Sequence, residues 1–320
     1  MVVRKKIFLF LICVCMLPLA SIAQFRVVGY VSVWGQSLPS VTDTAMKKLT
    51  HLNIAFVNPD SLGVLVLPAG MDSLIQQAHD SKVKVLVSLG GGSFNPHLAK
   101  LLKKPMRKEF VEKLVAIAVD HQLDGLDIDL EGDAIDENYD AFIADVSAAL
   151  KPTGKLLTAA FATWNAQLIS TASLKKFDFI NIMSYDQTGP WRPQEPGPHS
   201  TYSKAEEELQ YWTIQRGFPK KKINLGLPFY GYCFGTTYGQ SMSYGDIVAK
   251  FSDSWNQDMV VPPDGGIIYY NGVPTIRSKT ELALKNAGGV MIWQILQDSD
   301  GDRSLLTAID EVIHKKPAAK

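Results

Sequence analysis

Cysteine is scarce in this sequence of 320 residues, which contains only three. Two of them, Cys13 and Cys15, lie in an apolar segment near the N-terminus. If that segment is removed, Cys233 remains alone, which excludes an internal disulfide, and we expect it to be a small buried hydrophobic residue. The fold must therefore rely on its core, and a content of 46% hydrophobic residues is sufficient for a core of this size.

Net charge is also absent, because 32 basic residues balance 32 acidic ones. A chain without a basic excess lacks the electrostatic signature of proteins that bind nucleic acid or an anionic membrane. The six histidines show no metal-ligand spacing. Residues 298–302 (DSDGD) resemble part of a calcium loop but lack its spaced glutamate, so we expect a turn that caps the following helix. The sequence thus predicts no metal, no cofactor and no nucleic-acid partner.

The N-terminal residues 1–23 are typical of an export signal. Basic residues at positions 4–6 precede an apolar run over 7–19, and small residues follow at the positions that a signal peptidase reads. The alternative is an uncleaved membrane anchor, but the run is short for a membrane span. We expect cleavage after Ala23, a secreted or periplasmic protein without membrane attachment, and a single monomeric catalytic domain over residues 24–320.

Short β-rich apolar runs alternate with amphipathic helical patterns along this mature chain. The strand-like runs number eight and cover residues 27–33, 49–57, 83–89, 123–131, 156–161, 177–184, 223–230 and 289–294. Helical periodicity covers residues 71–79, 106–121, 139–150, 204–215, 280–286 and 304–313. Eight strands alternating with helices over this length predict a (β/α)8 TIM barrel. An open doubly wound sheet is the structural alternative, although no Gly-rich phosphate turn follows the first strand.

The connection between the last two predicted strands, about residues 233–287, is long enough to hold a small insertion. Within it, residues 266–276 read GIIYYNGVPTI, and Asn271-Gly272 between two apolar runs is a hairpin signal. We therefore expect a small β-rich insertion beside the barrel mouth, with a hairpin turn at Asn271-Gly272.

The most informative stretch is LDGLDIDLEGD at residues 123–133. Apolar side chains alternate with Asp127, Asp129 and Glu131, which is the period of a strand with three acids on one face. The alternative without a catalytic role is an edge strand at the surface whose acidic face is exposed to solvent. Same-face carboxylates repel one another, so at least one should hold a proton near neutral pH, as general acid catalysis requires. Asp124 is out of phase, and we expect it to be structural.

Five segments in order resemble glycoside hydrolase family 18, the chitinases and related endo-β-N-acetylglucosaminidases. DGLDIDLE at 124–131 resembles the acidic signature of that family. SLGG at 88–91, MSYD at 183–186, LPFYG at 227–231 and GGVMIW at 288–293 resemble the marks of its third, sixth, seventh and eighth strands. The resemblance extends over nearly the whole mature chain.

The resemblance implies a retaining mechanism in which the substrate supplies the nucleophile. Glu131 would protonate the glycosidic oxygen, and the 2-acetamido group of the sugar at subsite −1 would attack C1. Asp129 would turn between Asp127 and Glu131 and stabilise the acetamido nitrogen, while Asp127 would share a proton with Asp129. The hydroxyl of Tyr185 would hold the acetamido oxygen, and Asp186 would bond to the distorted sugar.

The resemblance also implies a set of substrate-binding residues. Trp293 would form the floor of subsite −1, and Ser88 would support the two aspartates. Trp191 is either a stacking platform at subsite +1 or an ordinary loop anchor. Tyr30 and Phe56 would lie beside Trp293 at this floor. The remaining expected members, which line or pack around the site, are Gly91, Met183 and Tyr230. The partners so implied are chitin, chitooligosaccharides or glycans that contain N-acetylglucosamine.

The sequence departs from the family pattern at two positions near the site. Gly92 stands where many chitinases have a tryptophan, and Tyr232 stands where many have an arginine. With the short insertion, these differences favour a shallow cleft for soluble oligosaccharides over processive attack on crystalline chitin. An endo-β-N-acetylglucosaminidase that cuts the N-glycan core is the alternative enzyme. A non-catalytic chitinase-like lectin is the alternative of another class, although such proteins usually lose one of the acids retained here.

Overall fold

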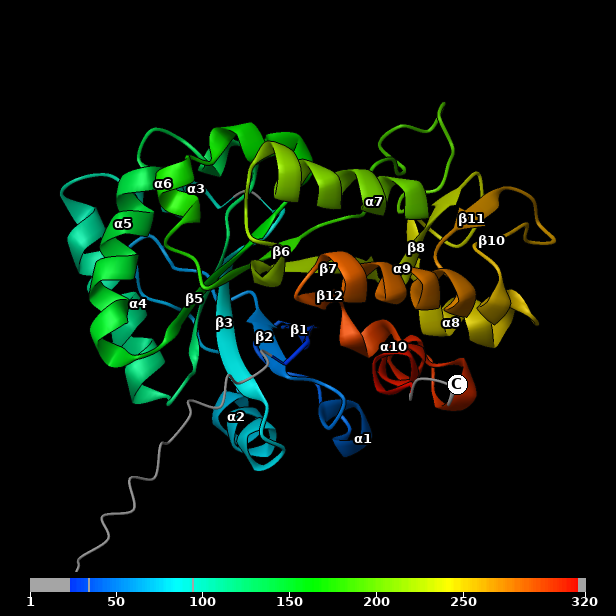
Figure 1. The fold of residues 1–320 in the computed structure, drawn as a ribbon, viewed down its shortest axis with the longest axis horizontal. Helices are drawn as coiled ribbons and strands as arrows, with labels where there is room; N and C mark the ends of the chain where they lie inside the picture. The colour runs from blue at the N-terminus through cyan, green and yellow to red at the C-terminus, as the bar shows by residue number, and fades with distance from the viewer. Residues whose placement is uncertain (1–23, 34, 94, 316–320) are drawn as a thin grey trace, which may run out of the picture.

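A computed structural model describes residues 24–33, 35–93 and 95–315, and shows a closed barrel of parallel strands surrounded by helices (Figure 1). The predicted export signal lies outside these residues. The barrel strands are β1 (Arg26–Ser32), β2 (His51–Ala55), β3 (Lys84–Gly90), β4 (Gly125–Asp129), β5 (Leu156–Phe161), β6 (Phe179–Ile182), β7 (Ile223–Pro228) and β12 (Gly289–Trp293). They close in the order β1-β12-β7-β6-β5-β4-β3-β2. The prediction of a (β/α)8 barrel is confirmed.

Helices follow the strands and cover the outside of the barrel. They are α1 (Asp43–Met46), α2 (Met71–Asp80), α3 (Pro96–Leu101), α4 (Met106–Asp120), α5 (Tyr139–Leu150), α6 (Thr171–Leu174), α7 (Tyr202–Gln210), α8 (Tyr244–Lys250), α9 (Val273–Asn286) and α10 (Leu305–His314). The pattern predicted over 204–215 changes to a π-helical turn at Tyr211–Gln215. None of the described helices is long and apolar enough to cross a membrane.

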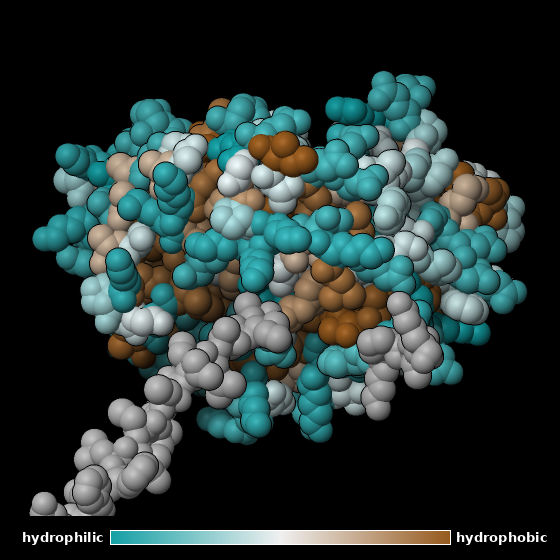
Figure 2. Space-filling view, viewed as in Figure 1, coloured by the Kyte–Doolittle hydropathy of each residue, from teal (hydrophilic) through white to brown (hydrophobic). Residues whose placement is uncertain are grey.

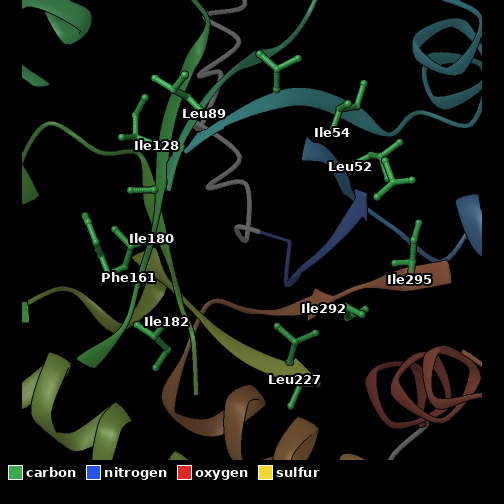
Figure 3. Packing of buried hydrophobic residues seen from close by; sticks show 14 of the residues in the cluster. Leu52, Ile54, Leu89, Ile128, Phe161, Ile180, Ile182, Leu227, Ile292 and Ile295 are labelled. Carbon is green, nitrogen blue, oxygen red and sulfur yellow. The ribbon is translucent and has the colours of Figure 1, made fainter. Parts of the chain in front are cut away.

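The main core lies between the barrel and its helices. Outward-facing residues from successive strands, such as Leu52, Ile128, Ile180 and Ile292, are spread around the ring of strands in Figure 3 and are fully buried. A second cluster fills the barrel interior and consists of Val28, Tyr30, Ala55, Phe179, Tyr185, Tyr230 and Met291. On the face shown in Figure 2, hydrophilic side chains form most of the outer surface, and hydrophobic ones lie mainly in recesses between them.

The connection from β7 to β12 contains the predicted β-rich insertion. Strands β8 (Tyr230–Phe234), β9 (Ser241–Ser243), β10 (Met259–Val260) and β11 (Ile267–Tyr269) form an antiparallel sheet in the order β10-β11-β8-β9. This sheet and α8 extend to one side of the barrel in Figure 1.

The predicted hairpin turn at Asn271-Gly272 is wrong. Gly272 precedes α9, which begins at Val273 with Pro274 in its first turn, where a proline favours a helix start. The amide of Asn271 is buried and donates to Ser200 O (2.9 Å). Tertiary contacts therefore replace the local turn that the dipeptide suggested.

Two expectations about acidic residues outside the site are confirmed. Asp124 accepts from Val85 N (2.8 Å) and lies 2.9 Å from His79 Nε2, which ties β4 to its neighbours. The carboxylate of Asp298 accepts from the backbone nitrogens of Leu305 (2.8 Å) and Leu306 (3.0 Å) at the start of α10. The DSDGD segment is thus a helix-capping turn.

Candidate active site

The acids of β4 face the barrel interior because strand register places them beside inward-facing neighbours. Ser88 on β3 pairs with Asp127, and Asp127 pairs with Thr158 on β5. Gly90 pairs with Asp129, and a Cβ at Gly90 would lie 2.1 Å from the Asp129 carbonyl oxygen. The chain after Asp129 leads to Glu131 at the carboxyl end of the strand, where the chemistry of (β/α)8 enzymes takes place.

Asp127 is the deepest of the three acids and accepts hydrogen bonds from three hydroxyl groups. Tyr30 and Ser88 each donate to Oδ2 at 2.7 Å, and Thr158 donates to Oδ1 at 2.5 Å. Burial raises the pKa of Asp127, and the three hydroxyl donors oppose that increase. The arrangement suits an ionised carboxylate held in one orientation.

Asp129 is buried next to Asp127 but lacks comparable support. Its Oδ1 atom has no hydrogen-bond partner among the described residues. Burial raises the pKa of Asp129 well above its usual range, and the charges of Glu131 and Asp127 add to the increase. Asp129 is therefore the inner acid on which a proton is more readily held, and the shared proton expected between Asp127 and Asp129 stays a prediction.

Glu131 lies at the rim and is half-buried. Burial, followed by the negative charge of Asp186, raises its pKa to about 7. A carboxylic acid with this pKa can hold a proton and release it near neutral pH, which suits a general acid and base. A Cβ at Gly92 would lie 3.4 Å from Glu131 Oε1, so this glycine leaves space beside the acid.

Tyr185 and Asp186 follow β6, which is separated from the acid-bearing β4 only by β5 in the barrel. The Tyr185 hydroxyl lies 3.7 Å from the sulfur of Met291, a weak acceptor, and burial raises its pKa well above 10. The hydroxyl therefore keeps its proton and can donate to a better acceptor. Asp186 has a φ of 61°, which is uncommon for a non-glycine residue, and accepts a hydrogen bond from the Tyr230 hydroxyl.

Aromatic rings form the floor of the site. The half-buried Trp293 stacks on Phe56 with centroids 5.5 Å apart and an interplanar angle of 23°. Gly91 makes this packing possible, because a Cβ there would lie 2.4 Å from the Phe56 ring. Tyr30 was expected to line the floor, but it is only 1% exposed. Its ring lies against Trp293 and its hydroxyl binds Asp127, so it supports the site from within the barrel.

An open cavity of about 810 Å³ adjoins Glu131 and the residues that follow β6, whereas Trp293 and Phe56 are not among its lining residues. The expected site residues that line it are Glu131, Met183, Tyr185, Asp186 and Trp191. Trp191 is 56% exposed and makes an edge contact with Tyr232. Its ring also covers Gly189, where a Cβ would lie 2.2 Å from the indole. Trp191 thus anchors its own loop and still presents an aromatic surface to the cavity.

Three residues near the site were not predicted from the sequence. Thr158 has the inward parity of β5, so strand register could have found it. Trp164, which is 68% exposed, lines the cavity from the 3-10 helix after β5 (Thr163–Leu168) and carried no motif. His199 is fully buried, with Nδ1 3.5 Å from Asp186 Oδ1. It lies near the end of the connection from β6 to α7 that also contains Asp186. The described residues contain no group of three or more His, Cys, Asp or Glu that could hold a metal ion.

The profile of glycosyl hydrolases family 18 matches residues 26–298. The chain belongs to this family. Its fold is similar to the crystal structure of a family 18 chitinase from the chitin utilization locus of Flavobacterium johnsoniae, with a TM-score of 0.82 and 37% identity. That match covers 91% of this chain and 94% of the other.

Some curated relatives of this chain are named chitinases, and others are named chitinase-like proteins. A class V chitinase of Arabidopsis thaliana is 28% identical over 75% of this chain and 71% of its own length. Chitinase-3-like protein 2 of Homo sapiens is 25% identical over 89% of this chain and 90% of its own length. Family 18 membership thus establishes the barrel and a chitinase-like ancestry, and the assignment of an activity depends on the site itself.

Proposed function

We propose that this protein is an exported, retaining glycoside hydrolase that cleaves β-1,4 linkages between N-acetylglucosamine units. The observation that carries the proposal is the position of Glu131. It lies at the mouth of the barrel beside an open cavity, with a pKa raised to about 7, above two buried aspartates. The chitinase names of relatives from Flavobacterium johnsoniae and Arabidopsis thaliana support the choice of substrate class.

Glu131 would first act as the general acid. Its raised pKa keeps a fraction of the carboxyl protonated at neutral pH, and the proton passes to the glycosidic oxygen as the C1–O bond breaks. The carboxylate so formed would later accept a proton from the attacking water, which restores the acid. Burial favours the protonated state before the reaction, and this state is the one that the first step consumes.

The substrate's own acetamido group would supply the nucleophile. Its carbonyl oxygen attacks C1, and the Tyr185 hydroxyl would donate to that oxygen. Among the described residues the acceptor of this hydroxyl is the sulfur of Met291, which is a weak one. Positive charge grows on the acetamido nitrogen in this step. Asp129, with an Oδ1 atom that lacks a partner, is the carboxylate available to accept the N–H and stabilise that charge.

The aromatic floor would hold the sugar at subsite −1. The Trp293 face suits the apolar face of a pyranose ring, and its stacking on Phe56 fixes the indole plane. Asp186 would accept a hydrogen bond from the same sugar. Trp191, on the cavity side of Glu131, would provide a platform on the leaving-group side.

Two substrates separate the enzymatic alternatives. The mature protein should be incubated with chitotetraose and, separately, with a high-mannose glycopeptide, and new reducing ends counted over time. Cleavage of chitotetraose at the higher kcat/KM is expected. Preferential cleavage of the glycopeptide would reassign the protein as an endo-β-N-acetylglucosaminidase. Binding of chitotetraose without turnover of either substrate would show a lectin instead of an enzyme.

A further inference from the structure

A chain of buried side chains connects the catalytic acids to the opposite end of the barrel. Arg26 Nε donates to Asn224 Oδ1 at 2.9 Å, and Asn224 Nδ2 donates to Asn181 Oδ1 at 2.8 Å. Asn181 Nδ2 then donates to the Tyr30 hydroxyl oxygen at 3.1 Å, and that hydroxyl donates to Asp127 at 2.7 Å. Four hydrogen bonds thus join the start of β1 to the deepest acid.

The interior members of this chain have no access to solvent. Asn181 and Asn224 are completely buried. At the far end, Arg26 is held in place by Lys221 O (2.6 Å) and by the ring of Phe179, whose centroid lies 4.7 Å from the guanidinium carbon. The chain is therefore fixed at a residue that touches none of the acids.

The direction of donation along the chain is set by its first member. A guanidinium has donors and no acceptor, so it selects the amide orientation of Asn224 that presents Oδ1. The Nδ2 group of Asn224 must then face Asn181 and select the same orientation there. The oxygen of Tyr30 consequently receives an N–H, which leaves its own proton for Asp127.

We propose that Asn181 and Asn224, anchored by Arg26, are positioning residues that force the Tyr30 hydroxyl to donate to Asp127. This inference rests on the proposed function, because its consequence concerns the acids that carry the reaction. The Asp127 carboxylate accepts hydrogen bonds from the hydroxyls of Tyr30, Ser88 and Thr158. A proton bound to Asp127 would displace one of these donors, so protonation of Asp127 is unfavourable. Asp127 therefore stays ionised, which leaves the exchangeable proton of the acid row to Asp129 and Glu131. Glu131 holds it for the first step, and Asp129 then acts as the carboxylate.

Other charged and titratable groups around the chain are few and identifiable. Asp127 faces Asp129 on its own segment, Asp129 in turn faces Glu131, and the buried Tyr139 lies near enough for the charges of both aspartates to act on its hydroxyl. At the other end, Arg26 lies near His51, which also feels Lys84. None of these groups interrupts the four hydrogen bonds.

Two variants test the proposal through the pH dependence of kcat/KM on chitotetraose. Asn181→Asp reverses the last link, because the new carboxylate accepts the Tyr30 proton and adds a negative charge near Asp127. The acidic limb of the profile should move up by about one pH unit or more, and kcat should fall about tenfold. Asn224→Leu, which contacts none of the acids, should move the same limb in the same direction by a smaller amount.

Thr280→Val is the matched control, because it removes a buried hydroxyl that donates to Ile276 O (2.8 Å) on the outer helix α9. It should leave the pH profile unchanged. In a protein that already carries Tyr30→Phe, Asn224→Leu should cause no additional shift of the acidic limb of the pH profile. Profiles of folded Asn181 and Asn224 variants that match the unsubstituted protein would overturn the proposal.

A second readout does not depend on turnover. The carboxyl carbon of Asp127 can be titrated by ¹³C NMR in the intact protein and in Asn224→Leu, with the signal assigned through Asp127→Asn. A higher pKa of Asp127 in Asn224→Leu supports the positioning role even if chitotetraose is not cleaved. An unchanged titration of Asp127 would reject it, and failure of hydrolysis alone would reject only the proposed function.

Discussion

The inner and outer halves of the acid row differ in how completely the protein satisfies them. Asp127, at the inner end, receives three hydroxyl donors and the end of a buried hydrogen-bond chain. Glu131 and Asp186, at the rim, lie beside an open cavity, and burial together with the charge of Asp186 raises the pKa of Glu131 to about 7. The inner acid is held in place by hydrogen bonds within the protein, and the outer acids remain able to interact with a substrate.

This contrast indicates where stability and reactivity lie in the barrel. A buried carboxylate with full hydrogen bonding contributes to a unique interior arrangement, and removal of one donor leaves an uncompensated charge. A rim carboxyl with a raised pKa costs stability when it ionises and provides reactivity in return. Substitutions at the two ends should therefore separate loss of activity from loss of stability.

After substitution of Glu131 itself, Tyr185→Phe should have the largest effect on kcat of the substitutions at the rim. It removes the hydroxyl that we expect to bind the acetamido oxygen, and kcat should fall about 10²-fold or more. Stability should be nearly unchanged, because the partner of that hydroxyl among the described residues is the sulfur of Met291, a weak acceptor. Steady-state kinetics on chitotetraose and thermal melts measure both quantities. A retained kcat would exclude the proposed role of Tyr185.

Thr158→Val tests the inner end. It removes one donor to Asp127, and the free energy of unfolding should fall by about 1–3 kcal/mol in chemical denaturation. Activity should fall less than in Tyr185→Phe. If Thr158→Val leaves stability unchanged while Tyr185→Phe lowers it, the contrast between the two ends is wrong.

Trp191→Ala tests the leaving-group side of the cleft. Loss of one aromatic platform should raise KM for chitotetraose roughly tenfold at an unchanged kcat, because stacking is worth about 1 kcal/mol or somewhat more. Trp164→Ala is the natural comparison, since both tryptophans are exposed and line the same cavity. An unchanged KM in Trp191→Ala, with a normal melting temperature, would identify Trp191 as a loop anchor alone.

Glu131→Gln should raise stability by a small amount that grows with pH. The folded pKa of about 7 lies above the usual value of 4.5, so the native state binds more protons between these pH values and the unfolding free energy falls as pH rises through them. At pH 4 the variant and the unsubstituted protein should melt within about one degree of each other. At pH 8 the variant should melt a few degrees higher. An equal difference at both pH values would show that Glu131 titrates normally.

The barrel and the acid row could be predicted because both depend on local periodicity. The alternation in residues 123–131 determines which side chains face inward, and eight short runs limit the fold to few topologies. The hairpin at Asn271-Gly272 could not be judged locally, because contacts of Asn271 with Ser200 and a helix start at Pro274 decide that segment.

Residues that act through distant contacts were also beyond the sequence. His199 approaches Asp186 through the fold of their shared connection from β6 to α7, and Asn224 reaches Asp127 through Asn181 and Tyr30. An isolated asparagine in an apolar strand carries no signal of its partner. Tyr30 is a further example. It was expected beside Trp293 under the sugar, but its position in β1 directs the hydroxyl to Asp127, to which it donates a hydrogen bond.

The most direct test of the account is the hydrolysis of chitotetraose followed by ¹H NMR from the first minutes, with Glu131→Gln in parallel. The account predicts that the unsubstituted protein releases the β-anomer first, because the acetamido group and then water attack C1 from opposite faces in succession. It also predicts a loss of about 10²–10⁴-fold in kcat for Glu131→Gln, with the fold intact. Initial release of the α-anomer, or turnover that survives in Glu131→Gln, would contradict the central role assigned to the end of β4.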